Sequence, residues 1–167
     1  MQRHQLVAVD TNILLGIGGR DEDTVDSLRL ILKKAAPVQL VLCPTVLQET
    51  AHLAANSDDP ATRSLAVMSI GEIAAWGLHP NILNAVQRAV ADNAAALLLQ
   101  RGLVPSAELN DARILAEAAV LGCVLLVSKD SHLIGLDALA LSIIFHELDL
   151  TAPVVATPRD LLRKFYR

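Results

Sequence analysis

Short apolar runs alternate along the chain with longer segments in which apolar residues recur at helical spacing. This order is typical of βαβ units around a parallel sheet. The short runs carry Val and Leu at nearly every position, which indicates strands that are covered on both faces. We expect four such strands, at residues 6–9, 38–43, 123–127 and 154–156.

The longer segments predict helices, because capping residues or prolines stand at their starts and glycines stand where they should end. The expected helices are residues 23–36, 45–56, 60–76, 82–100, 110–121 and 158–166. Two consecutive helices between residues 59 and 102 form a helical insertion, which we expect to cover the sheet, act as a lid or form an oligomer contact. Residues 139–145 fit either a fifth strand or a helical turn. The sequence therefore predicts one α/β domain over residues 1–167, with three α/β/α layers and a central parallel sheet of four to five strands.

Four acidic residues fall where this topology brings them together. Asp10 directly follows the first strand, and Asp130 comes three residues after the third. The carboxyl ends of parallel strands lie at the same edge of a sheet, so these two acids share one edge. Ligands bind at that edge in open parallel sheets. Asp111 lies in the first turn of a helix that must begin at that edge. Glu49 lies about 7 Å along the helix that leaves the second strand, and its side chain leans back toward the edge.

Four ionised carboxylates in one small site repel one another, so either one or more of them are protonated or a divalent cation neutralises them, and the cation is the simpler answer. Oxygen ligands alone favour Mg²⁺ or Mn²⁺ over zinc. Such a site suits phosphodiester hydrolysis, in which the cation supplies an activated water and stabilises the phosphate oxygens. Each acid taken singly could instead be a helix cap, a turn residue or a solvated acid. Their joint placement favours the metal site.

Composition narrows the class of protein. With 167 residues, 53% apolar residues and 19% charged residues, the chain is not disordered. Aromatic residues make up only 2%, which excludes an RNA-binding sheet built on aromatic stacking. The longest apolar run, residues 118–127, is too short for a membrane span, and the first residues do not form a signal peptide, so we expect a cytoplasmic protein without a membrane partner. Cys43 and Cys123 lie in apolar surroundings and are expected to be buried thiols.

The net charge of −4 argues against a protein that coats duplex nucleic acid, but it is compatible with an acidic, metal-dependent nuclease. Local cations must then position the phosphate backbone. Arg159, Arg163 and Arg167 are spaced by four on the last predicted helix, with Lys164 beside them. These four residues are our candidates for RNA contact, and a solvated charged face is the alternative.

Two other features have simple interpretations. Gly16, Gly18 and Gly19 lack the Lys-Ser/Thr ending of a phosphate-binding loop, so we expect a flexible turn there. The acidic run at residues 21–26 is expected to be a solvated helix start.

Several motifs resemble the PIN-domain family of metal-dependent ribonucleases. They are VAVDTNILL at residues 7–15, LQETA at 47–51, LNDARILAEAA at 109–119 and LVSKDSHL at 126–133. Their order and spacing agree across nearly the whole chain, and VVATPRDLL at residues 154–162 is similar to the last strand and helix of that family. The resemblance implies a PIN-like fold.

The resemblance also implies roles for particular residues. The acids Asp10, Glu49, Asp111 and Asp130 match the quartet that holds Mg²⁺ or Mn²⁺. The polar side chains that match supporting positions are Thr11, Asn12 and Ser128. The chain departs from a common family pattern at His132, where an acid often stands. This departure leaves two substitutes for the acid that would hold a second metal, Asp137 or Glu108. His132 itself is either an exposed loop residue or a residue with a role at the metal.

The function implied by this resemblance is an endoribonuclease that hydrolyses RNA with Mg²⁺ or Mn²⁺. A stand-alone chain of this kind resembles the toxin of a bacterial toxin-antitoxin pair, which implies an antitoxin protein as partner, and a homodimer is a further option. The alternative is a non-catalytic PIN-like module that binds RNA or protein and has an impaired metal site. Phosphate-monoester hydrolysis by an aspartate nucleophile is disfavoured, because Asn12 stands where that chemistry generally needs a second acid.

Overall fold

The computed structural model describes residues 4–35 and 37–165, and its centre is a five-stranded sheet. The strands are β1 (Gln5–Val9), β2 (Val38–Leu42), β3 (His79–Pro80), β4 (Leu125–Val127) and β5 (Val154–Ala156). Their order across the sheet is β3-β2-β1-β4-β5, and every neighbouring pair is parallel. The expected parallel α/β fold is confirmed.

Strand β1 lies in the middle of the sheet, where Val7 pairs with Leu40 on one side and Leu125 on the other. A central strand of this kind is covered on both faces, which explains why Val7, Ala8 and Val9 are all apolar and buried. The carboxyl end of β1 opens onto the same edge as the end of β4, because Val9 pairs with Val127. The residues that follow these two strands therefore meet.

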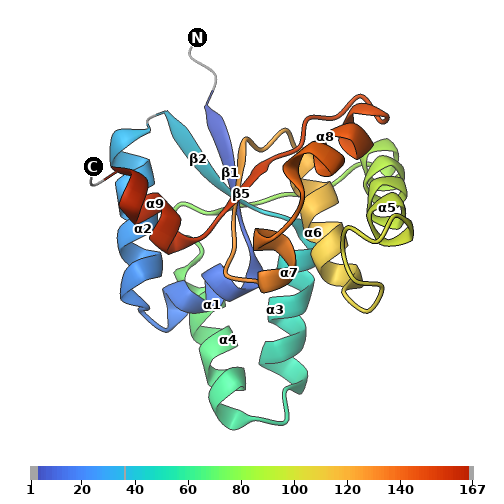
Figure 1. Cartoon of the computed structure of the whole chain (residues 1–167). Helices are drawn as coiled ribbons and strands as arrows, with labels where there is room; N and C mark the ends of the chain where they lie inside the picture. Colours follow the sequence, from blue (N-terminus) through green and yellow to red (C-terminus); the bar gives the residue numbers. More distant parts are fainter. Residues whose placement is uncertain (1–3, 36, 166–167) are drawn as a thin grey trace.

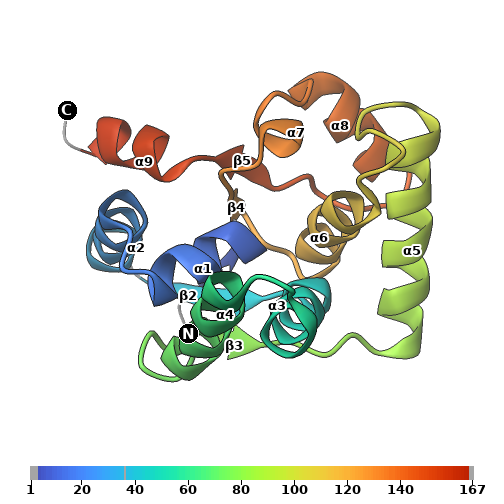
Figure 2. The same ribbon diagram turned by 90° about the horizontal axis from the view of Figure 1, so that it is seen from below.

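Helices cover both faces of the sheet (Figures 1 and 2). Their bounds are α1 (Thr11–Gly18), α2 (Glu22–Lys34), α3 (Pro44–Asn56), α4 (Pro60–Glu72), α5 (Ala85–Gln100), α6 (Leu109–Val120), α7 (Ser131–Ile134), α8 (Ala138–His146) and α9 (Pro158–Phe165). Helices α2 and α9 pack together on one side, and α5 and α6 pack together on the other. Helices α3 and α4 extend beyond the carboxyl ends of the strands, toward the bottom of Figure 1.

The segment that the sequence left open, residues 139–145, lies within helix α8. Asp137 caps this helix by accepting hydrogen bonds from the backbone N–H groups of Leu139 and Ala140. Leu141, Ile144 and Phe145 are buried, and their spacing of three and four residues places them on one helical face. The strand alternative is therefore wrong, because capping and helical spacing act together here.

The flexible turn expected at Gly16, Gly18 and Gly19 is also wrong, because the first two of these glycines belong to helix α1. A Cβ at Gly16 would lie 2.8 Å from Oγ1 of Thr24, and one at Gly18 would lie 2.8 Å from backbone atoms of Ser69. These glycines are thus needed for close packing of α1 against α2 and α4, whose residues they touch.

The helical insertion at residues 59–102 is interrupted by β3, which pairs with β2 at the edge of the sheet through Val41 and His79. A two-residue strand has no periodicity that a sequence can display, so the pattern predicted only helices there. Helix α4 packs on α1 and α3, whereas α5 packs on α6 and α8.

The core contains the central strands and the inner faces of the helices, and Phe145 is the largest fully buried side chain among the described residues. Cys43 and Cys123 are buried and free, as expected. Burial raises the pKa of the Cys123 thiol to about 12, so this thiol is protonated at neutral pH.

In the described ranges, the helices are all too short or too polar to cross a bilayer.

Candidate active site

A cavity of about 570 Å³ lies at the carboxyl edge of the sheet, between the end of β1 and helices α1, α3 and α6. All four acids of the expected quartet line it, so the structure brings together Asp10, Glu49, Asp111 and Asp130. The full lining is Asp10, Thr11, Asn12, Leu15, Thr45, Gln48, Glu49, His52, Leu53, Asn110, Asp111 and Asp130. The topological argument from strand ends and helix starts therefore places these acids correctly.

Asp10 is the most buried of these acids, with 3% of its surface exposed. It is the N-cap of α1, and its Oδ1 accepts a hydrogen bond of 2.6 Å from the backbone N–H of Thr11. Its Oδ2 accepts hydrogen bonds from Asn12 Nδ2 at 3.0 Å and from Ser128 Oγ at 2.5 Å. Two of the three side chains expected to support the site thus hold this carboxylate.

The third supporting side chain, Thr11, donates its hydroxyl to Oε2 of Glu49. The other oxygen of Glu49, Oε1, accepts a hydrogen bond of 2.8 Å from Asn110 Nδ2. Glu49 comes from α3, Thr11 from α1 and Asn110 from α6. These two bonds therefore fix the Glu49 carboxylate between three helices.

Asp130 precedes α7 and caps it, since its Oδ1 accepts a hydrogen bond of 2.7 Å from the N–H of His132. Its own backbone N–H donates to Ser128 Oγ at 2.9 Å. One hydroxyl, that of Ser128, therefore joins the backbone of Asp130 to the carboxylate of Asp10. The ends of β1 and β4 are held together at the cavity by this contact.

Asp111 stands in the first turn of α6, and its Oδ2 is buried without a hydrogen-bond partner in the described part of the chain. Burial raises the pKa of Asp111 to about 6, and the negative charges of Asp130, Asp10, Glu108 and Glu49 add to the increase. A buried carboxylate oxygen without a donor is costly unless a cation or a proton occupies the space before it. The residues present therefore fit a bound cation.

The electrostatics at Asp10 point the same way. Burial raises the pKa of Asp10 above its ordinary value, and the charges of Glu49 and Asp130 raise it further, while hydrogen bonds from Ser128 and Thr11 lower it. The net effect is a raised pKa of Asp10, although three hydrogen-bond donors surround its carboxylate. A divalent cation among these acids would reverse the sign of the local field and favour their charged forms.

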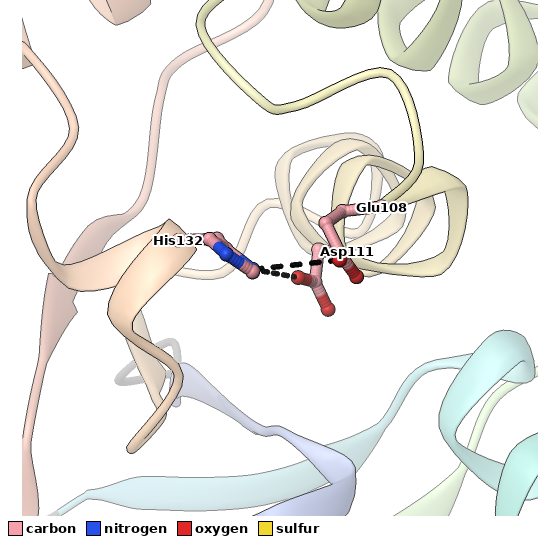
Figure 3. A group of neighbouring side chains, drawn as sticks. All are labelled: Glu108, Asp111 and His132. Atoms are coloured by element: carbon pink, nitrogen blue, oxygen red, sulfur yellow. Dashed lines mark ion pairs between the residues drawn. The ribbon is translucent and has the colours of Figure 1, made fainter.

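His132 lies beside the quartet on α7. Its Nδ1 is 3.6 Å from Oδ2 of Asp111 and 3.8 Å from Oε1 of Glu108 (Figure 3). Within the described ranges, these three residues form a group whose ligand atoms all lie within 4.8 Å of one another. Of the two substitutes considered for the missing acid, Glu108 is therefore near His132. The other, Asp137, caps α8 instead.

The cations expected to contact RNA do not line this cavity in the described part of α9. Arg159 forms an ion pair of 2.8 Å with Asp23, which connects α9 to α2. Arg163 and Lys164 belong to the same helix, and Arg167 lies outside the described residues. The acidic run of α2 is accordingly paired in part, since Asp21 also forms an ion pair of 2.7 Å with Lys129.

Two other cations, which the sequence did not indicate, line a hollow that adjoins the cavity. A second hollow of about 480 Å³ shares Thr45 and Gln48 with the first, and it is lined by Arg88 of α5 and Arg113 of α6. Neither arginine has a carboxylate within 4.0 Å in the described ranges. These two residues lie 25 positions apart, and the only signal for Arg113 is that it stands two residues after Asp111.

A buried acid behind the cavity connects α3 to α6. Glu117 is 8% exposed, and its carboxylate accepts hydrogen bonds from the backbone N–H of Thr45 at 3.0 Å and from its hydroxyl at 2.7 Å. Burial raises the pKa of Glu117 above its ordinary value. This contact holds the start of α3, and with it Glu49, against the helix that carries Asp111.

Comparison with known proteins places this geometry in context. A family model described as the PIN domain matches residues 7–139. No curated protein matches the chain. Among solved structures 11 chains match, and one is the crystal structure of VapBC2 from Rickettsia felis bound to a DNA fragment from their promoter. That match has a TM-score of 0.61 and 17% sequence identity, and it covers 92% of this chain and 98% of the other. At this identity the likeness concerns the fold.

Proposed function

The chain belongs to the PIN-domain family, and from that premise we propose that it is an endoribonuclease that depends on Mg²⁺ or Mn²⁺. The observation that carries this proposal is the cavity in which four carboxylates meet and the Oδ2 atom of Asp111 is buried without a partner. An oxygen-rich site of this kind suits a hard divalent cation. The proposed ligands are Asp10, Glu49, Asp111 and Asp130.

A bound cation would supply an activated water and stabilise the negative charge that develops on the phosphate. The protein's own contribution is to hold the carboxylates in place before the substrate arrives. Ser128 and Asn12 fix Asp10, while Thr11 and Asn110 fix Glu49. Because both oxygens of each of these two carboxylates accept a hydrogen bond, both side chains are held in one orientation in the folded protein.

We propose that the RNA backbone passes from the acidic cavity toward the adjoining hollow. The two hollows adjoin at Thr45 and Gln48, which line both, and Arg88 and Arg113 of the second hollow offer guanidinium groups for phosphate contact. Contact by Arg163 and Lys164 on α9 stays a prediction, whereas Arg159 must first break its ion pair with Asp23. The cations beside the cavity are therefore our first choice for binding RNA.

We further propose that the protein acts as the toxin of a toxin-antitoxin pair in the cytoplasm. The likeness in fold to a chain of VapBC2 supports this role, as does the resemblance of a stand-alone chain of this kind to the toxin of such a pair. The expected partner is an antitoxin protein that blocks the acidic cavity.

Cleavage of a mixed RNA pool by purified protein tests the enzymatic proposal. We expect cleavage with Mg²⁺ or Mn²⁺, none with EDTA, and a loss of at least about 100-fold in Asp10→Asn and in Asp130→Asn. Asp149→Asn is the matched control, because Asp149 is exposed and lies at a positive φ that Asn accepts readily. Circular dichroism of each variant separates lost chemistry from lost folding.

Two results would overturn the enzymatic proposal. One is RNA that stays intact with every cation at high protein concentration. The other is equal cleavage by the wild type and by folded Asp10→Asn protein. Intact RNA together with tight RNA binding would instead support the non-catalytic binding module.

The toxin role has a separate test in bacterial cells. Induced expression of the wild type is expected to stop growth, whereas folded Asp10→Asn protein at the same level is expected not to. Equal growth of both cultures would reject the toxin role while leaving the nuclease proposal to the cleavage assay.

A further inference from the structure

The imidazole of His132 is surrounded by carboxylates that it does not hydrogen-bond. Its Nδ1 lies 3.3 Å from Oδ1 of Asp130, 3.6 Å from Oδ2 of Asp111 and 3.8 Å from Oε1 of Glu108. None of these contacts has hydrogen-bond geometry in the described part of the chain, where the bond to Asp130 comes from the backbone N–H of His132. The ring nitrogen lies within ion-pair distance of all three carboxylates, and these separations also suit neighbouring ligands of one cation.

Two of the three acids near this nitrogen are presented by one turn of helix. Glu108 and Asp111 are separated by three residues at the start of α6, so their side chains project on the same side toward α7 (Figure 3). Glu108 occupies the N-cap position of α6, where its side chain makes no capping hydrogen bond within the described part of the chain. Its carboxylate instead faces His132 and can act as a ligand.

Asp111, which also lines the four-acid cavity, adds to the evidence for an occupant. The oxygen that faces His132 is Oδ2, which is buried and has no hydrogen-bond donor among the described residues. One nitrogen and two carboxylate oxygens converge on the same small volume, and all three ligand atoms lie within 4.8 Å of one another. Three such ligands leave further coordination positions open for water or a phosphate oxygen.

We propose that Glu108, Asp111 and His132 form a mixed nitrogen and oxygen subsite for a divalent transition-metal ion, beside the four-acid cavity. Imidazole is a good ligand for Mn²⁺, Ni²⁺ and Zn²⁺, whereas Mg²⁺ prefers oxygen. The subsite therefore selects transition metals over Mg²⁺. Asp111 belongs to both sites, so in this respect the inference rests on the proposed function. Occupation of the subsite would place a second positive charge next to the reacting phosphate.

Metal binding without RNA tests the subsite on the full chain. Metal-free protein is titrated with Mg²⁺, Mn²⁺ and Ni²⁺ in a calorimeter. We expect His132→Ala to weaken Ni²⁺ binding by about tenfold or more and to change Mg²⁺ binding by less than about threefold. His132→Asp, which offers an oxygen in place of the nitrogen, is expected to keep Mg²⁺ and Mn²⁺ binding and to lose the preference for Ni²⁺. His146→Ala is the matched control, because His146 is an exposed histidine on α8.

A spectroscopic measurement identifies the ligand directly. Pulsed electron paramagnetic resonance of the Mn²⁺-loaded wild type is expected to show coupling to a histidine nitrogen, and this coupling should vanish in His132→Ala. Glu108→Gln is expected to weaken Ni²⁺ binding while keeping the nitrogen coupling. Nitrogen coupling that persists in His132→Ala, or Ni²⁺ affinity equal to that of the wild type, would overturn the subsite.

These outcomes separate the inference from the proposed function. If Asp10→Asn abolishes RNA cleavage but His132→Ala binds Ni²⁺ like the wild type, the nuclease stands and the subsite falls. If His132→Ala loses Ni²⁺ selectively and no RNA is cleaved by any form, the subsite stands and the nuclease falls.

Discussion

The hydroxyl of Ser128 donates a hydrogen bond of 2.5 Å to Oδ2 of Asp10, across 118 positions of sequence. Both side chains are buried, and the same hydroxyl accepts the backbone N–H of Asp130 at 2.9 Å. A single oxygen therefore couples two of the four acids and joins the ends of β1 and β4. This arrangement orients a proposed metal ligand through a group that need not touch the metal itself.

Among the described residues, replacement of Ser128 by Ala is expected to leave Asn12 as the one side-chain donor to Oδ2 of Asp10. Because the hydrogen bond from Ser128 lowers the pKa of Asp10, its loss should raise that pKa further and disfavour the charged form that binds a cation. We expect a loss of about 10-fold to 100-fold in metal affinity or in RNA cleavage. Calorimetric titration with Mn²⁺ measures the first, and initial cleavage rates measure the second. Ser142→Ala, at an exposed position of α8, should match the wild type.

Asp111 is expected to destabilise the metal-free fold. Its pKa is raised to about 6 from an ordinary value of 3.8, so the folded state binds more protons than the unfolded state between these values. Stability contributed by the protonated form is therefore present below about pH 4 and is lost as the pH rises through about 6. In EDTA, Asp111→Asn should then unfold at a higher temperature than the wild type at pH 7.5, by roughly 2–6 °C.

Thermal unfolding of both proteins from pH 4 to pH 8 checks this effect. The difference between variant and wild type should grow across the interval from pH 4 to pH 6.5 and then level off. A difference in unfolding temperature that stays constant over the whole pH range would show that ionisation of Asp111 does not destabilise the fold. Saturating Mn²⁺ should reverse the ranking at pH 7.5, because the cation stabilises only the protein that binds it.

Cation binding is expected to depend on pH through the same carboxyl group. Asp111 must release its proton to act as a ligand, so the affinity for Mn²⁺ should rise as the pH increases through about 6 and reach a plateau above about 7. Titrations at pH 5.0, 6.0, 7.0 and 8.0 measure this dependence. An affinity that is flat over this range would mean that Asp111 is already ionised in the metal-free protein.

The sequence predicted the parallel sheet and the meeting of the acids because both follow from the hydrophobic pattern and from general rules of sheet topology. Strands such as β1 are apolar at every position, and the carboxyl ends of parallel strands must share an edge. The same rules missed helix α1, because Gly16 and Gly18 argue against a helix unless the helices that approach them are known. Close packing against Thr24 and Ser69 is a tertiary fact, and no local pattern contains it.

The finer arrangement of the site could not be predicted for a related reason. The sequence indicates that Asp10 and Asp130 share an edge, but not that Ser128 bridges them or that Asn110 holds Glu49. His132 stands 24 positions after Glu108, and only the packing of α7 beside α6 makes them neighbours. Likewise, the spacing of Arg159 on α9 suggested a phosphate contact, whereas in the folded chain it pairs with Asp23.

Arg113 is expected to contribute to RNA binding but not to the chemical step. Arg113→Gln should raise KM for a short RNA about threefold to tenfold and leave kcat unchanged, because one phosphate contact is lost. The dependence of binding on salt should also become shallower, by about 0.7 in the slope of log K against log salt. Lys33→Gln, on α2 at the other side of the sheet, is the control. A fall in kcat with unchanged KM would instead place Arg113 in the catalytic machinery.

The buried contact between Thr45 and Glu117 is expected to set the stability of the wall that carries Glu49. Thr45→Val keeps the shape of the side chain but removes the hydroxyl that donates to Oε1 of Glu117, so that oxygen becomes a buried acceptor without a donor. The expected cost is about 1–3 kcal/mol. For a domain of this size that cost corresponds to a decrease in Tm of roughly 2–4 °C for each kcal/mol.

Glu117→Gln should cost less stability than Thr45→Val. The amide keeps an acceptor for the backbone N–H of Thr45, and it replaces a buried carboxyl group whose pKa is already raised. Thermal unfolding at pH 7.5 distinguishes the two, and a larger loss in Glu117→Gln would mean that the charge itself stabilises the contact.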